Sequence, residues 1–178
     1  VAVYGPDGQR WDAIARKDAP AVAPPPEHLS PETMNAVKDG DWLPPEYAAG
    51  GEAKAAVLRY LEPVVRDGQR RAWVVGTVGP ALADGLLDLS RARFEDRPDG
   101  VLLLDGAGRV FAGPRSGPLG IGGSLVGRDV LTHIDLSRVD RAHDFGSATE
   151  FTDEAGERMV GTVRWIPAQR FAVAVRRP

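Results

Sequence analysis

The chain of 178 residues contains no cysteine and only three histidines. Without cysteine it has no thiol nucleophile, no thiolate zinc site and no disulfide framework. The three histidines, His28, His133 and His143, are too far apart in sequence for any two to share one helical turn. No histidine pair therefore offers a metal site, and we expect neither a metal nor a cofactor.

An excess of positive charge and a long apolar run are also missing. The 22 basic residues are outnumbered by 25 acidic ones, which gives a net charge of −3. A nucleic-acid-binding protein needs basic side chains for phosphate contacts, so nucleic acid is not an expected partner. The longest weakly polar stretch, residues 72–83, is far shorter than the roughly 20 residues of a membrane span. No secretory signal opens the chain, which begins with Val1, and we expect it to be either an excised soluble segment of a longer protein or a processed product.

The most informative feature present is an internal similarity at an offset of 100 residues. Residues 1–11 and 101–111 both have the pattern of a strand, a tight turn and a strand, with Gly8 and Gly108 at the same place in the turn. Glycine supplies the positive φ that such hairpin turns require. The similarity predicts that the chain contains two units of the same design.

The repeat predicts three parts: a first unit at 1–78, a connector at 79–100 and a second unit at 101–178. Leucines of the connector recur at helical spacing, so the connector is predicted to be a helix. Each unit is expected to run from a hairpin through a short helical cover into antiparallel strands. This order predicts an α+β fold in which helix and loop cover one face of each sheet.

Turn residues and alternating patterns place the individual elements. In the first unit they predict an extended proline-rich segment (19–26), a short helix after Ser30, an irregular loop (41–51) and strands at about 56–65 and 71–78. In the second unit they predict a glycine-rich loop (113–127), a short helix at about 128–137 and strands near 145–152, 157–166 and 170–176.

Four stretches of this pattern carry a family resemblance. They are the strand, turn and strand at 61–78, the hairpin at 101–110, the loop at 121–129 that leads into a short helix, and the closing strands at 151–175 with Trp165. Together they resemble the double form of the Cache family, the PAS-like sensor domains of bacterial transmembrane receptors.

The resemblance implies two PAS-like modules, with 1–78 distal to the membrane and 101–178 proximal to it. It also implies a non-enzymatic, extracytoplasmic (periplasmic) sensor domain in a parent protein anchored in the inner membrane. Binding of a small molecule would be passed to a transmembrane helix beyond Pro178, and the output domain would be a histidine kinase, a cyclase or a chemotaxis signalling domain. A homodimer is compatible with this interpretation.

Aromatic residues and one arginine of the first unit are the candidate ligand-binding residues. Trp42 and Tyr47 lie in a predicted loop over the sheet, whereas Arg59 and Tyr60 lie on the strand that follows. Such side chains can hold a small carboxylate-bearing or aromatic ligand. Strand alternation, however, puts Arg59 and Tyr60 on opposite faces. Equally, the three aromatic side chains could simply fill the core.

In the second unit Arg128 and His133 are the corresponding polar candidates. Two other functional classes stay open. One is a ligand-free interaction or dimerisation module of the same fold. The other is a small serine hydrolase that uses Ser124, although its glycine-rich surroundings do not match a nucleophile elbow because Gly127 comes one residue too late.

Overall fold

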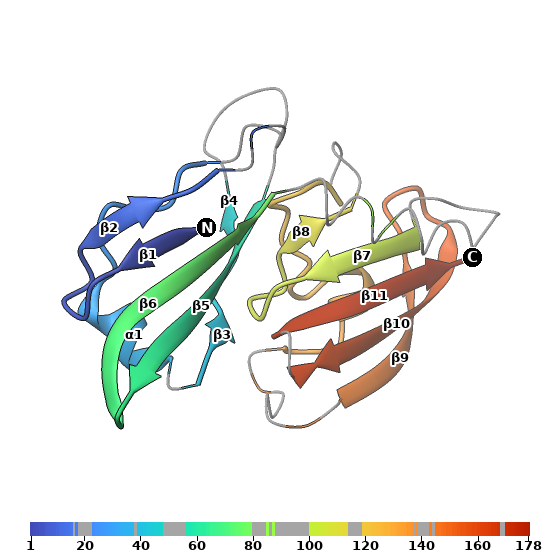
Figure 1. Cartoon of the computed structure of the whole chain (residues 1–178). Coiled ribbons are helices and arrows are strands. Elements are labelled where there is room, and N and C mark those ends of the chain that lie inside the picture. Colours follow the sequence, from blue (N-terminus) through green and yellow to red (C-terminus); the bar gives the residue numbers. More distant parts are fainter. Residues whose placement is uncertain are drawn as a thin grey trace. The chain divides into compact units, whose positions relative to one another are not determined.

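Two antiparallel sheets organise the chain in the computed structural model (Figure 1). The structure describes residues 1–15, 17, 23–37, 39–47, 56–79, 85, 87, 100–113, 119–136, 138, 143, 145–167 and 170–178. The contacts divide the chain into one unit of Val1–Pro45 with Val57–Gly79 and a second unit of Glu46–Ala56 with Pro80–Pro178. Each unit has a sheet and a hydrophobic core of its own.

The first sheet has six strands, of which five form the path β2-β1-β6-β5-β3 while β4 pairs with β5. In chain order the elements are β1 (Ala2–Tyr4), β2 (Arg10–Ala13), α1 (Pro31–Ala36), β3 (Asp41–Trp42), β4 (Glu46–Tyr47), β5 (Ala56–Arg66) and β6 (Gln69–Val78). The two-residue turn between β5 and β6 has positive φ at Asp67 and Gly68, as a tight hairpin requires. This hairpin fixes which residues of the two longest strands face each other.

Helix α1 begins where its sequence dictates. The Ser30 hydroxyl caps it by accepting a hydrogen bond from the Thr33 amide at 3.1 Å, and Pro31 occupies the first turn. Met34 of this helix is buried and belongs to a core with inward-facing residues of the sheet and its flanking loops: Ala2, Tyr4, Leu29, Val37, Leu61, Trp73 and Val75. The helix therefore covers the inner face of the first sheet.

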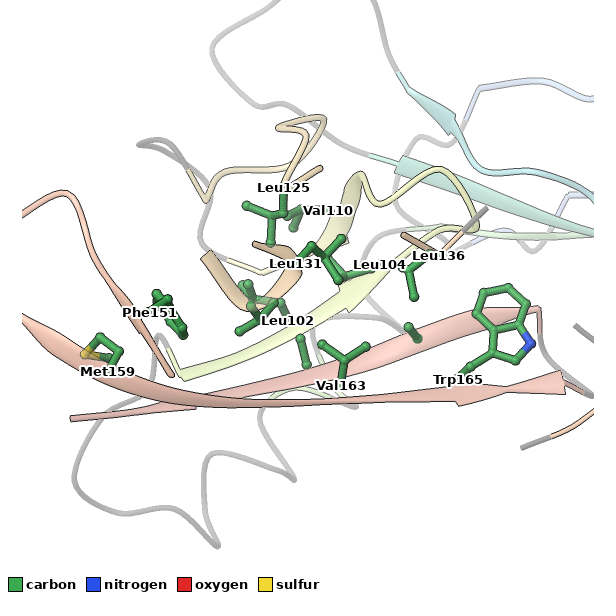
Figure 2. Close-up of a cluster of buried hydrophobic side chains, with 13 residues drawn as sticks. Leu102, Leu104, Val110, Leu125, Leu131, Leu136, Phe151, Met159, Val163 and Trp165 are labelled. Atoms are coloured by element: carbon green, nitrogen blue, oxygen red, sulfur yellow. The ribbon is translucent and has the colours of Figure 1, made fainter. Parts of the chain in front are cut away.

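The second sheet has five strands in the order β8-β7-β11-β10-β9. Its elements are β7 (Val101–Leu104), β8 (Val110–Ala112), the short 3₁₀ helix η2 (Asp129–Leu131), β9 (Phe145–Thr152), β10 (Arg158–Ile166) and β11 (Phe171–Arg177). Along β10 buried and exposed residues alternate, which is the pattern of a sheet with one face in water. Figure 2 shows the buried face, where Val163 of the sheet lies beneath Leu125 and Leu131 of the covering loop and helix, while Trp165 lies at one end of the cluster.

The two sheets repeat one design. Their strand orders match when β1, β2, β3, β5 and β6 are equated with β7, β8, β9, β10 and β11. The Gly8 carbonyl accepts a hydrogen bond from the Leu29 amide, and the Gly108 carbonyl accepts one from the Leu125 amide, both at 2.9 Å. The internal similarity of the sequence thus has a counterpart in backbone hydrogen bonds, which lets residues of the two sheets be compared one by one.

The strands of both units lie within two residues of the limits that the sequence predicts. Two predicted elements differ. The expected irregular loop at 41–51 contains the short strands β3 and β4. The expected helix at 128–137 is only the 3₁₀ turn η2 and further turns, because its backbone bonds span three residues, as from the Leu131 amide to the Arg128 carbonyl.

The predicted connecting helix at 79–100 falls almost wholly outside the described residues. Gly85 and Leu87 within it have helical conformation, and the Leu87 side chain is buried. Among the residues that the structure describes, no helix is long and apolar enough to cross a membrane.

Replacement of Gly161 by alanine tests the fit of η2 on the second sheet. A Cβ atom at Gly161 would lie 2.5 Å from Val130 Cγ1 and 2.9 Å from Phe151 Cε1, which is too close. We expect Gly161→Ala to lower the free energy of unfolding by about 1–3 kcal/mol, as overpacking does. Urea unfolding followed by circular dichroism measures it.

The control is Gly146→Ala in β9, where the nearest atom to a new Cβ is the Val163 carbonyl oxygen at 3.9 Å. That change should leave the free energy of unfolding within about 1 kcal/mol of the parent value, since it meets only an ordinary contact. Equal effects of the two substitutions would contradict the described packing of η2.

Candidate functional site

The inner face of the first sheet carries a buried arginine. Strand alternation places Arg59 on the same face as the core residue Leu61, and only 3% of Arg59 is exposed. One of its terminal nitrogens, Nη2, donates to the Pro24 carbonyl oxygen at 3.3 Å. A buried guanidinium needs such partners, because an unsolvated charge is costly.

The proline-rich segment over this face is held by side chains of the sheet. The Tyr4 hydroxyl donates to the Pro26 carbonyl at 2.7 Å, and Arg10 Nη1 donates to the Pro25 carbonyl at 2.6 Å. Proline has no amide hydrogen to donate, so a run of prolines cannot form the full ladder of a strand, and side-chain donors bond its carbonyls here. Tyr4, Arg10 and Arg59 together fix residues 24–26 above the sheet.

Two polar atoms on this face have no hydrogen-bond partner in the described structure. Thr77 lies directly opposite Arg59 across β5 and β6, so both side chains point to the same face. The Thr77 hydroxyl and the indole nitrogen of Trp73 are buried and form no hydrogen bond. Buried polar atoms are nearly always bonded, and exceptions in natural proteins call for an explanation such as a bound water, an ion or a functional role.

Thr77 is not among the candidate residues that the sequence pattern indicates. The local signal for it is the hairpin turn at Arg66–Gln69, which sets the register between β5 and β6. A bulge between Val64 and Val65 shifts that register by one residue, so counting back from the turn alone would pair Arg59 with Gly76. The bulge is what brings a hydroxyl next to the arginine.

Trp42 and Tyr60 lie together on the opposite face of the sheet from Arg59. They pair across β3 and β5, and their rings meet edge to face with centroids 5.3 Å apart. Partial burial raises the pKa of the Tyr60 phenol, and the neighbouring carboxylate of Glu62 raises it further. Two of the three predicted aromatic residues, Trp42 and Tyr60, are therefore brought together with each other, but not with Arg59.

Tyr47 lies on β4, a strand of the first sheet, but its segment, Glu46–Ala56, is grouped with the second unit. Its hydroxyl donates to Asp105 Oδ2 at 2.7 Å, while Asp105 Oδ1 accepts from the amides of Ala107 and Arg109, both at 2.9 Å. Burial raises the pKa of Tyr47 far above its ordinary value, and the bond to the Asp105 carboxylate acts in the same direction. The tyrosine thus braces the turn between β7 and β8.

The polar candidates of the second unit are near the surface. Arg128 Nε donates to the Ser124 carbonyl at 2.7 Å, and its guanidinium lies 3.6 Å from Glu154 Oε1. His133 and Ser124 are exposed. In the part of the chain that the structure describes, no group of three His, Asp or Glu side chains is placed to hold a metal ion.

Solved structures resemble this chain over most of its length. The ligand-binding domain of the Pseudomonas aeruginosa PAO1 amino acid chemoreceptor PctB, solved with L-Gln, matches with a TM-score of 0.59 and 15% identity over 98% of this chain and 66% of that one. The ligand-binding domain of the Pseudomonas fluorescens chemoreceptor CtaA, solved with L-serine, matches with a TM-score of 0.57 and 15% identity over 98% and 70%. The extracellular domain of the putative histidine kinase mmHK1S-Z3 matches with a TM-score of 0.60 and 14% identity over 83% and 52%.

The chain has the double Cache fold. The resemblance seen in the sequence is therefore confirmed at the level of the fold. At these identities the likeness shows the fold alone, and the chain spans roughly half to two thirds of the matched chains. Neither the protein-family models nor the sequences of curated proteins give a match.

Tyr47 predicts a pH dependence within this double Cache fold. Above pH 10 the unfolded chain loses the phenol proton whereas the folded chain keeps it, because the folded pKa is raised. The contribution of this tyrosine to stability is therefore present below about pH 10 and declines as the pH rises further.

We expect Tyr47→Phe to be less stable than the parent by about 1 kcal/mol near pH 8, where the hydrogen bond to Asp105 is intact. The difference should shrink near pH 11, since only the parent has this phenol to titrate. Urea unfolding of both proteins at the two pH values measures it. A difference that does not change with pH would contradict the role assigned to Tyr47.

Proposed function

We propose that this chain is the extracytoplasmic sensor domain of a bacterial signalling receptor and that it binds a small carboxylate-bearing molecule without catalysing a reaction on it. In this proposal 1–78 is the membrane-distal module, 79–100 is a connecting helix and 101–178 is the membrane-proximal module of a membrane-anchored parent protein. The fold supports it, because matched domains are ligand-binding or extracellular domains of receptors, and two of them are solved with amino acids.

The observation that carries the proposal is the cross-strand pair of Arg59 and Thr77. A guanidinium binds a carboxylate through charge-assisted hydrogen bonds, and a neighbouring hydroxyl can supply another. Thr77 has a buried hydroxyl that the described structure leaves without a partner, next to an arginine that is 3% exposed. A buried hydroxyl without a hydrogen-bond partner lowers the stability of the folded state. Such a cost is expected where the hydroxyl serves ligand binding.

Residues 24–26, which cover this site, provide a way for ligand binding to change the structure of the first unit. Side-chain donors of the sheet bond the carbonyls of residues 24–26, and one of these donors is Arg59 itself. A carboxylate that accepts hydrogen bonds from Arg59 changes the position of the guanidinium group that donates to the Pro24 carbonyl of the cover. Such a ligand shifts the position of the cover only to the extent that it binds one arrangement better than the other.

The ligand roles predicted for Trp42, Tyr47, Tyr60, Arg128 and His133 stay predictions. Their positions favour Arg59 over the others as an anchor, since Arg59 is the one of the six that is buried and charged on an inner sheet face. Trp42 and Tyr60 lie on the opposite face, where they would suit a separate contact.

A thermal-shift screen against L-amino acids and simple monocarboxylates, with amines as a comparison set, tests the proposal. We expect at least one carboxylate-bearing compound to raise the melting temperature, and calorimetry then gives its affinity. If no compound raises it, the ligand-free interaction module of the same fold becomes the better interpretation.

Thr77→Val is the decisive variant because it removes the hydroxyl and keeps the shape. The hydroxyl has no partner in the described structure, so the melting temperature without ligand should stay the same or rise. Affinity for the carboxylate should fall by about tenfold, the value of one hydrogen bond to a charged group. Thr162→Val, at an exposed position of β10, is the matched control and should change neither.

Arg59→Lys, which keeps the charge but not the planar fork, should also weaken binding, whereas Arg158→Met at an exposed position should not. Undiminished binding by both Thr77→Val and Arg59→Lys would place the ligand elsewhere in the chain.

A further inference from the structure

A buried carboxylate connects the cover of the second unit to its last strand. Asp129 is the first residue of η2, and its Oδ1 atom lies 2.9 Å from Nε of Arg176 in β11. Both side chains are only 10% exposed. Breaking such a buried ion pair on one side leaves an uncompensated charge and is strongly destabilising.

Asp129 is held in a strained conformation to make this contact. Its φ of +54° lies in the left-handed region, which costs a non-glycine residue roughly 1 kcal/mol or more. The same Oδ1 atom accepts the Val130 amide at 2.7 Å, and the fully buried Val130 side chain fits against Gly161. The position of the carboxylate is therefore set by the cover as well as by the arginine.

Arg176 occupies the place on its sheet that corresponds to Thr77 on the first. Arg59 faces Thr77 across β5 and β6, and Gly161 faces Arg176 across the equivalent strands β10 and β11. At this equivalent cross-strand pair each sheet has one arginine, which lies on β5 in the first sheet and on β11 in the second. The first unit begins its covering helix with Pro31 and the second unit begins it with Asp129.

The Arg176 site has the features of an anion-binding site. Its guanidinium lies over the ring of the buried Phe151, with Cζ 5.5 Å from the ring centre. The Nε–H group is close to Asp129 but not aligned with it as a hydrogen bond. The arginine therefore retains a donor that a freely placed carboxylate could engage with better geometry.

We propose that the second unit contains a carboxylate-binding site at Arg176 whose occupant is Asp129 of the same chain. The Asp129 side chain acts as an internal ligand that fixes η2 to β11. In this arrangement the second unit takes no external ligand, and removal of the Asp129 side chain opens a site that accepts acetate, the free equivalent of an aspartate side chain.

The test is Asp129→Gly with acetate as the probe. Glycine relieves the positive φ and leaves room where the carboxymethyl group was. We expect the melting temperature to fall by several degrees, because Arg176 loses its counter-charge. Acetate should then raise the melting temperature of this variant in a saturable way, as a ligand of the folded state does.

Three comparisons make the result specific. Sodium chloride at equal ionic strength and acetamide, the neutral analogue, should not restore the melting temperature. The parent protein should not gain stability from acetate at this site, since Asp129 already fills it. The double variant Asp129→Gly with Arg176→Met should gain no more stability from acetate than the parent protein does, because the guanidinium is gone.

The proposal fails if Asp129→Gly is as stable as the parent, if acetate has no effect on it, or if the double variant responds to acetate equally. If Asp129→Gly is unfolded in plain buffer, recovery of the folded circular dichroism spectrum on adding acetate is the expected result, and no recovery overturns the proposal. The ligand of the first unit does not enter this test, since acetate binding to Arg59 would persist in the double variant.

Discussion

A buried guanidinium on the inner face of each sheet is the feature on which the rest of the structure depends. Each sheet has one face against a thin cover, so an inward-facing arginine must find its partners in that cover. In the first unit Arg59 donates to the carbonyl of Pro24, and in the second Arg176 lies against the carboxylate of Asp129. The covers are thus positioned by charge as well as by apolar packing.

The two sheets distribute the same large side chains differently. In the first, Trp73 lies on β6 and Arg59 on β5; in the second, Trp165 lies on β10, the equivalent of β5, and Arg176 on β11. Both tryptophans are almost fully buried. This exchange of strands keeps one bulky ring and one charge on each inner face. The partner of the arginine is a proline carbonyl in the first cover and a carboxylate in the second, which is the basis on which we propose one sensing module and one structural module.

Most of the fold could be predicted because turns and alternation are local signals. The turn at Arg66–Gln69 and the period-two pattern of β10 fix strands without reference to distant residues. The sites could not be predicted in the same way. Pairing of Arg59 with Thr77 depends on a one-residue bulge, and the contact of Asp129 with Arg176 joins residues far apart in sequence. Arg128 is a candidate from the sequence, whereas its neighbour Asp129, which makes the contact, is not.

The most direct measurement is an NMR titration of the arginine Nε–H groups with carboxylate-bearing ligands, the signals of Arg59 and Arg176 being assigned through Arg59→Lys and Arg176→Lys. Both groups are buried, so their Nε–H protons should exchange slowly enough with water to be observed. The account predicts that a ligand from the screen shifts the Arg59 signal in a saturable manner and leaves the Arg176 signal unchanged. A shift of Arg176 alone, or no shift of either under saturating ligand, would contradict it.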